Sequence, residues 1–153
     1  MSTDLYQESI ASFEYMNYQL NEAKMFADVT DGIAIIINSV TGIYYGMNGL
    51  GTGIFDSFLK GASEADVLKA FKDLPGAPAD CDIRLKTFVD TLKGFEIIVP
   101  ATEESSVPVT LSAKDAQFDA FTPTCNEYSD VQELLFADPI HEVKEDEGWK
   151  PEK

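Results

Sequence analysis

One stretch of this chain, residues 31–59, constrains the fold more than any other. It reads DGIAIIINSVTGIYYGMNGLGTGIFDSFL, with a short β-branched run at positions 33–38 (IAIIIN) and a run that begins with an isoleucine and two tyrosines at positions 43–48 (IYYGMN). The turn sequence SVTG separates these two runs, and its Gly42 can adopt the positive φ of a tight turn. Beyond a glycine-rich corner, apolar residues recur at helical spacing: Ile54, Phe55, Phe58 and Leu59. The stretch therefore predicts a strand, a turn, a second strand and a helix.

A third strand is expected before this hairpin. Residues 22–29 have strand character, and Thr30-Asp31-Gly32 would turn the chain into the next strand. Together the three strands would form an antiparallel meander. Its last strand would lie at the sheet edge, where unpaired N–H and C=O groups can accept an added peptide strand. Positions 43, 45 and 47 would face one side of this strand and 44 and 46 the other, and the pattern does not decide which side is the core.

Three helices should follow the meander. The first covers about residues 51–59, and the second begins at Ser63, where SEAD is a capping box with Asp66 in place of the longer Glu. The third spans about residues 80–93, ends at Gly94 and has an apolar set made of Ile83, Leu85, Phe88, Val89 and Leu92. FEIIVP, residues 95–100, would return as a wing-like strand. The expected fold is therefore α+β: a winged helix-turn-helix with an N-terminal three-stranded antiparallel sheet and three helices.

The chain divides into three expected parts. Residues 1–21 form an N-terminal arm or helix, residues 22–100 form the folded domain, and residues 101–153 form an acidic, partly disordered extension. Within the extension, residues 110–121 have no clear period, residues 129–136 hold an apolar cluster, and the last residues are mostly charged.

Charge and composition exclude several classes of protein. The net charge of −16, from 27 acidic and 11 basic residues, repels nucleic acids and anionic membranes. No apolar run approaches the roughly 20 residues of a membrane helix, and the N-terminus has no signal-peptide pattern, so we expect a cytoplasmic protein. Cys81 and Cys125 form no CxxC motif, and their spacing does not decide whether they pair.

Nothing in the sequence predicts catalysis or a cofactor. The one histidine, His141, is 60 positions from Cys81, so no nucleophile has a base near it in sequence, and a metal site would need further ligands. No carboxylate pair stands out as an acid–base dyad, and the glycines of GMNGLGTG lack the GK[ST] of a phosphate loop. We therefore expect a protein that is not an enzyme and binds no cofactor or metal.

An ordered set of features over residues 22–100 resembles the PqqD family. The set comprises a hydrophobic strand ending near Asn38, then Gly42, the pairs Tyr44-Tyr45 and Ile54-Phe55, a capped second helix, and a third helix ending in Leu92 and Gly94. Met47 stands where the family usually has Leu, and Phe55 where many members have Trp. The end of the chain, EYSDVQELLFADPIHEVKEDEGWKPEK, resembles an extension found in some members, although Phe136-Ala137 replaces their leucine pair.

The resemblance implies peptide binding. Members of the family, called RiPP recognition elements, capture the leader of a ribosomally made precursor peptide and present it to a modifying enzyme, often a radical SAM protein. The leader adds to the third strand and lies against the third helix. Mapped onto this sequence, the candidate peptide-binding residues are Ile43, Tyr44, Tyr45 and Met47 on the strand and Arg84, Lys86, Thr87 and Thr91 on the helix. Arg84 and Lys86 would attract an acidic leader.

Other interpretations stay open at this level. The tyrosines can be core aromatics, and Arg84 and Lys86 can belong to a solvated face. A winged helix can regulate transcription, but residues 80–93 balance three aspartates against three basic residues, which disfavours DNA. A protein-interaction adaptor, with Trp149 as an anchor, and a homodimer through the edge strand are further alternatives. The DPIHEV segment can also occupy the leader site as an internal strand. The precursor, the enzyme and the oligomeric state do not follow from the sequence.

Overall fold

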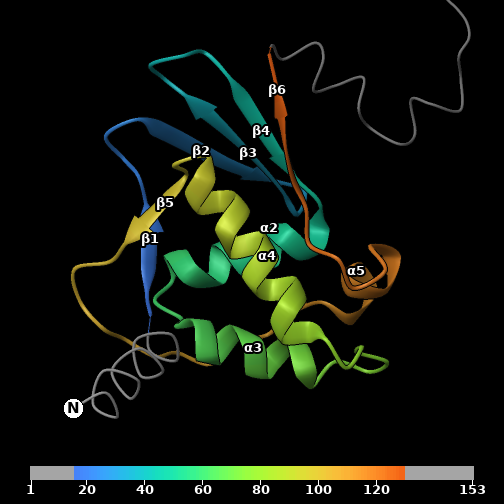
Figure 1. Cartoon of the computed structure of the whole chain (residues 1–153). Coiled ribbons are helices and arrows are strands. Elements are labelled where there is room, and N and C mark those ends of the chain that lie inside the picture. Colours follow the sequence, from blue (N-terminus) through green and yellow to red (C-terminus); the bar gives the residue numbers. More distant parts are fainter. Residues whose placement is uncertain (1–15, 130–153) are drawn as a thin grey trace, which may run out of the picture.

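Three consecutive strands form the meander that the sequence predicts. In the computed structural model, which describes residues 16–129, they are β2 (Met25–Thr30), β3 (Ile33–Asn38) and β4 (Tyr44–Met47) (Figure 1). Asp31 and Gly32 join β2 to β3 at φ values of 56° and 76°. Positive φ at both positions is typical of a type I′ turn, whose twist matches the strands that it joins.

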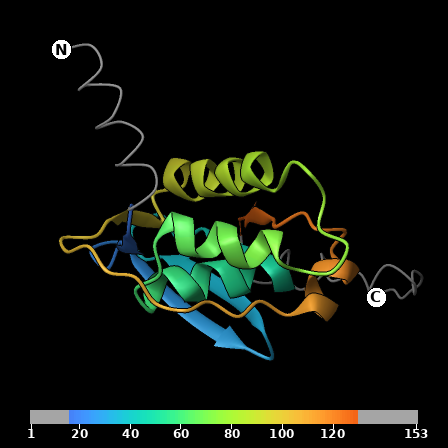
Figure 2. The same ribbon diagram turned by 90° about the horizontal axis from the view of Figure 1, so that it is seen from below.

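Three helices follow β4 near the expected positions: α2 (Gly49–Leu59), α3 (Glu64–Lys72) and α4 (Cys81–Gly94). The predicted capping box is confirmed, since the Asp66 N–H donates to the Ser63 hydroxyl at 3.1 Å and the Ser63 N–H donates to the Asp66 carboxylate at 2.9 Å. Seen from below, the three helices lie side by side, and the β2–β3 hairpin extends beyond them (Figure 2).

The helices and the inner face of the sheet enclose one hydrophobic core. Its largest buried side chains include four phenylalanines: Phe55, Phe58, Phe71 and Phe88. Two expected core residues are instead at the surface, since Ile83 is 63% exposed and Leu59 is 39% exposed. Ile83 lies two residues before the buried Leu85, which is about 200° around a helix, so the two cannot share one face.

A separate two-stranded sheet closes the other end of the domain. β1 (Tyr18–Leu20) pairs antiparallel with β5 (Ile98–Pro100). Of the N-terminal arm or helix expected over residues 1–21, residues 18–20 form a strand rather than a helix, and residues 1–15 lie outside the described part of the chain. The expected wing strand forms, but it pairs with β1 rather than with the meander, so the fold class is α+β without a confirmed winged helix.

Residues 101–128 continue on the surface of the same body. An extended segment leads to α5 (Ala113–Phe118) and then to β6 (Cys125–Tyr128), which pairs antiparallel with β4 and gives the sheet order β2-β3-β4-β6. Leu111, Ala116 and Cys125 are buried members of the core. The part of the assigned extension that the structure describes is thus packed on residues 22–100.

Some expectations concern residues outside the described range. They are the apolar cluster after Ser129, the DPIHEV segment, His141, Trp149 and the charged end. Among residues 16–129, no helix is both long enough and apolar enough to span a membrane.

A buried hydrogen bond ties β1 to α3. The Tyr18 hydroxyl donates to Glu64 Oε1 at 2.6 Å, and Glu64 is only 4% exposed. Burial raises the pKa of both groups. At Glu64, burial outweighs the hydrogen bond from Tyr18, which lowers the pKa. At Tyr18, the hydrogen bond to Glu64 and the charge of Glu64 raise the pKa further. The folded protein therefore holds the Glu64 proton more firmly than the unfolded chain does.

This shift predicts a pH-dependent effect of Glu64→Gln. The raised folded-state pKa gives stability that is fully present below the unfolded pKa of about 4.3 and is lost as the pH rises through the folded value. The substituted glutamine keeps an oxygen for Tyr18 but has no proton to lose. Urea unfolding from pH 4 to 8 should show the variant gaining stability relative to wild type as the pH rises. The exposed control Glu22→Gln should differ from wild type in unfolding free energy by an amount that does not change with pH. The same pH-independent difference for Glu64→Gln would contradict a raised pKa of Glu64.

Candidate functional site

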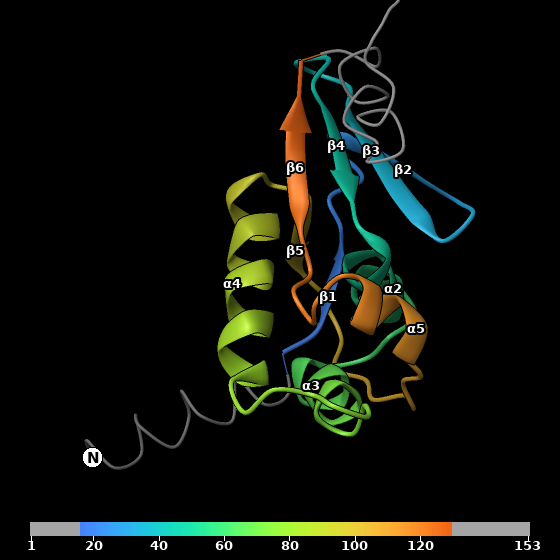
Figure 3. The ribbon, with the colours of Figure 1, turned by 90° about the vertical axis from the view of Figure 1, so that its right-hand side faces the viewer.

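The β4 edge, which the sequence leaves open to a peptide, carries a strand of the chain itself. β6 pairs with β4 over its whole length, with Tyr44 opposite Tyr128 and Met47 opposite Cys125. β6 also contacts α4, and Figure 3 shows it running between β4 and that helix. We call the edge of β4 together with the adjacent side of α4 the strand site. In this structure β6 occupies it.

Alternation along β4 decides the question that the sequence leaves open. Tyr45 and Met47 point inward and are 4% and 3% exposed, whereas Tyr44 and Gly46 lie on the outer face. The Tyr45 ring packs against Phe95 with 4.8 Å between centroids, and burial, with Glu127 as the next cause, raises its pKa. Ile43 precedes β4 and packs against the core. The side chains of Tyr45 and Met47 therefore support the site from beneath.

Tyr44 belongs to a row of apolar side chains on the outer face of the sheet. The register aligns Phe26, Ile37, Tyr44 and Tyr128 across all four strands. Cross-strand neighbours of this kind stabilise a sheet by about 0.2–1 kcal/mol per pair. Because Phe26 is 66% exposed, the row remains accessible at the β2 end.

Arg84 holds the chain just before β6. Its Nη1 donates to the carbonyl oxygens of Ala120 at 3.1 Å and Phe121 at 3.3 Å, and to the Thr122 hydroxyl at 3.1 Å. Its Nε donates to Asp80 Oδ1 at 2.8 Å, one helical turn earlier, which orients the guanidinium. The residue that the sequence selects as a peptide anchor thus binds backbone carbonyl groups of its own chain.

The other α4 candidates divide between two sides of the helix. Thr87 and Thr91 follow Arg84 by three and seven residues, so they continue along the same side, and the Thr91 hydroxyl donates to the Thr87 carbonyl at 2.9 Å. Lys86 is about 200° from Arg84 around the helix. It lies 3.9 Å from the Asp90 carboxylate and is one of the cations acting on Glu64. The structure therefore groups Arg84 with Thr87 and Thr91, and places Lys86 elsewhere.

Residues 119–128, the returning segment, are bound to the start of α2. Asn48 is the N-cap: its Oδ1 accepts from the Gly51 N–H at 2.8 Å and from the Thr124 N–H at 3.1 Å. Its Nδ2 donates to the Thr122 carbonyl at 2.8 Å. Asp119 Oδ2 accepts from the Leu50 N–H at 2.8 Å, an arrangement that the positive end of the helix dipole favours. One asparagine thus caps the helix and fixes the returning segment.

Gly51 explains why the α2 corner is rich in glycine. A Cβ at this position would lie 2.9 Å from the Thr124 carbonyl oxygen and 3.1 Å from Phe88 Cε1. The sequence suggests that these glycines permit a tight corner. The structure shows in addition that Gly51 lets the returning segment approach α2 closely.

The turn into β6 contains strained backbone. Ala120 and Phe121 have φ values of 55° and 57°, in the left-handed region that favours glycine. Each such residue costs roughly 1–3 kcal/mol unless its surroundings compensate. The contacts of Arg84 and Asn48 with residues 120–124 provide this compensation.

Both cysteines lie in the described part of the chain, residues 16–129. Cys81 and Cys125 are unpaired and buried, and burial raises the pKa of Cys125 to about 12, far from that of a reactive thiolate. Within residues 16–129, no three His, Cys, Asp or Glu side chains are grouped to hold a metal ion.

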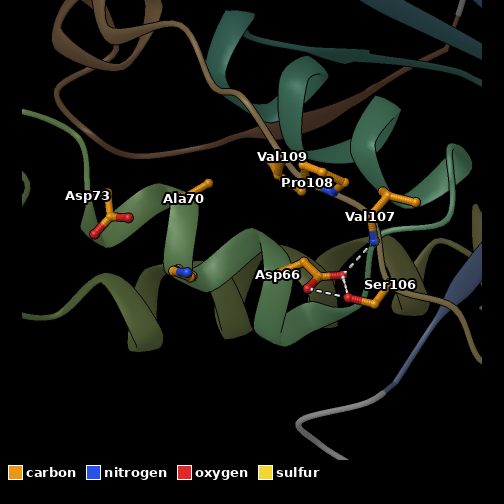
Figure 4. A pocket seen from close by; sticks show the side chains of 8 residues that line it. Asp66, Ala70, Asp73, Ser106, Val107, Pro108 and Val109 are labelled. Atoms are coloured by element: carbon orange, nitrogen blue, oxygen red, sulfur yellow. Dashed lines mark hydrogen bonds between the residues drawn. The ribbon is translucent and has the colours of Figure 1, made fainter.

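A hollow of about 500 Å³ lies between α3 and residues 106–109 (Figure 4). Its lining residues are Asp66, Lys69, Ala70, Asp73, Ser106, Val107, Pro108 and Val109. The Asp66 carboxylate accepts from the Ser106 hydroxyl at 2.8 Å and the Val107 N–H at 3.2 Å. These bonds, with that from Ser63, lower the pKa of Asp66 although burial opposes the shift. The Asp66 contacts here are structural, and we assign no ligand to the hollow.

The close approach at Gly51 makes a testable prediction. Ala is favoured over Gly within a helix by about 1 kcal/mol, so both Gly51→Ala and Gly53→Ala gain this term. A Cβ at Gly53 meets only Leu111 Cδ2, at 3.4 Å, whereas one at Gly51 meets a backbone carbonyl. Urea unfolding should show Gly53→Ala more stable than Gly51→Ala by about 1–3 kcal/mol. Equal stabilities would mean that the returning segment is not seated against α2.

No family model, curated protein or solved structure that we compared with this chain matches it. A functional assignment therefore depends on the residues and contacts described above. Two of them bear on function: a strand paired with the β4 edge, and an arginine that binds the backbone carbonyls of the segment leading to it.

Proposed function

We propose that the protein binds an extended peptide by strand addition at the strand site and presents it to a peptide-modifying enzyme. The observation that carries this proposal is the pairing of β6 with β4, which demonstrates that this edge accepts an antiparallel strand from a distant part of the chain. Main-chain hydrogen bonds of this kind give affinity without demanding a particular sequence.

Side chains around the site support the same function. Arg84 recognises backbone carbonyl groups, which every peptide offers, and Thr87 and Thr91 continue its side of α4, the helix that contacts β6. Tyr44, on the outer face, lies opposite Tyr128 in the register of the added strand. These contacts are the kind that would add selectivity to a binding mode based on backbone pairing.

The resemblance to the PqqD family points to the same class of ligand. On this proposal the fold is a variant of the winged helix-turn-helix, the ligand is the leader of a ribosomally made precursor, and the location is cytoplasmic. The protein itself would use no cofactor and catalyse no step. Its partners would be the precursor and the enzyme that modifies it.

Three alternatives have less support. A transcription regulator would present a basic helix, whereas Arg84 and Lys86 on α4 lie within 4.0 Å of Asp80 and Asp90 and the whole chain carries −16. A homodimer through β4 would first require β6 to leave that edge. An interaction adaptor of another kind would use the same edge for a different peptide.

Photo-crosslinking tests the proposal. A benzophenone amino acid replaces Thr87 in one variant and Lys86 in a matched control, since both positions are exposed on α4 but face different sides. Fluorescent peptides copied from short precursors encoded beside the gene are the probes. Saturable binding with crosslinks from position 87 and not from 86 is expected. Absence of binding by all such peptides, or equal crosslinking from both positions, would contradict the proposal.

A further inference from the structure

We infer that the returning segment is an internal competitor for the strand site, which an incoming peptide must displace. This inference rests on the proposed function and adds its regulation. It starts from the fact that the edge that would bind a ligand is already paired, by residues 125–128 of the same chain. A ligand strand and β6 cannot pair with the same edge of β4 at once.

β6 has the features of an element that can leave without unfolding the domain. It is four residues long, and Cys125 is the one residue in it that is buried, while Asn126 and Glu127 are exposed. It is also the last strand of the described chain, so its departure breaks no connection within the core. Elements with few buried side chains at the margin of a fold open locally at low free energy.

The backbone before β6 favours release as well. Ala120 and Phe121 are both left-handed and neither is glycine, so the closed arrangement holds strain that opening relieves. The groups that compensate for this strain are Arg84 and Asn48, and they bind mainly backbone atoms of residues 120–124. An incoming peptide offers the same backbone atoms, so these side chains can transfer their hydrogen bonds from one strand to the other.

The internal strand also indicates the chemistry of a stronger ligand. At the Cys125 position, the site accepts a small apolar side chain opposite Met47. At the Tyr128 position, it accepts an aromatic ring beside Tyr44. The expected ligand is an extended peptide with a small apolar residue and an aromatic residue three positions later.

Tethering sets the strength of the competition. A strand attached through a short connection acts at an effective concentration in the millimolar range, so a free peptide of equal intrinsic affinity binds poorly. Weak and non-specific peptides are thereby excluded. Changes confined to β6 should alter peptide binding although they leave β4 and α4 unchanged.

The test uses the full chain and a fluorescein-labelled synthetic peptide with the sequence of residues 119–129. Cys125→Asp places a charge in the buried position of β6, and Glu127→Pro disturbs strand pairing at an exposed position. Asn126→Asp is the matched control, because it adds the same charge as Cys125→Asp at an exposed position of the same strand. Fluorescence anisotropy measures the dissociation constant of each protein for the probe.

We expect Cys125→Asp and Glu127→Pro to bind the probe at least tenfold more tightly than wild type and Asn126→Asp. Adding Ala120→Gly to Cys125→Asp should reverse part of this gain, because glycine removes strain from the closed form. If all of these proteins bind the probe with the same measurable dissociation constant, β6 is not a competitor, and the proposed function remains intact. Circular dichroism checks that Cys125→Asp and Glu127→Pro are folded. If these folded variants do not bind the probe, β6 does not compete with a peptide for the strand site, and the inference is refuted. The crosslinking experiment at position 87 then decides the proposed function separately.

Discussion

The second edge of β4, which pairing with β3 leaves open, is the constraint on which the arrangement of the C-terminal part of the domain depends. An edge strand exposes N–H and C=O groups that invite pairing, and residues 125–128 satisfy those of β4. The pairing of β6 with β4 explains the roles of several residues that are far apart in the sequence. Asn48 caps α2 and also binds residues 122 and 124, Gly51 leaves room for the Thr124 carbonyl, and Asp119 accepts from the first turn of α2. The corner between β4 and α2 therefore serves both as a turn and as a seat for the returning segment.

Arg84 connects this arrangement to function. An arginine on a largely polar helix surface usually contributes little, and its ion pair with Asp80 is partly exposed. Here Asp80 instead orients the guanidinium toward two backbone carbonyl groups at strained positions. Recognition of carbonyl groups is independent of sequence, which would suit the proposed exchange of one strand for another. If the proposed function is right, the site of this chain of net charge −16 would hold a peptide mainly through the peptide's backbone groups.

Local signals determined how much could be predicted. The Asp31-Gly32 turn, the β-branched runs on either side of it and the Ser63 capping box each act within a few residues, so the sequence predicts the meander and the three helices. β6 has no such signal: its four residues, CNEY, are mostly polar, and its partner lies about 80 positions earlier. Of the four predicted α4 residues, Arg84, Thr87 and Thr91 recur at three- and four-residue steps and so share one side of the helix. Lys86 lies two residues after Arg84, about 200° around the helix, so helical geometry alone could have separated it from them. Ile83 lies two residues before Leu85, so the same geometry could have removed it from the core set.

Native-state hydrogen exchange of the wild-type protein tests most directly whether the strand site can exchange its occupant. If β6 is displaceable, its amide protons should exchange through local opening, at least about 100-fold faster than those of α4 and the β2–β3 hairpin, because a marginal strand opens well below the global unfolding free energy. The amides of β4 that bond to β6 should exchange at the same faster rate. Exchange of β6 only through global unfolding, at the rate of the slowest α4 amides, would show that β6 is a permanent fourth strand and would contradict this view of the site.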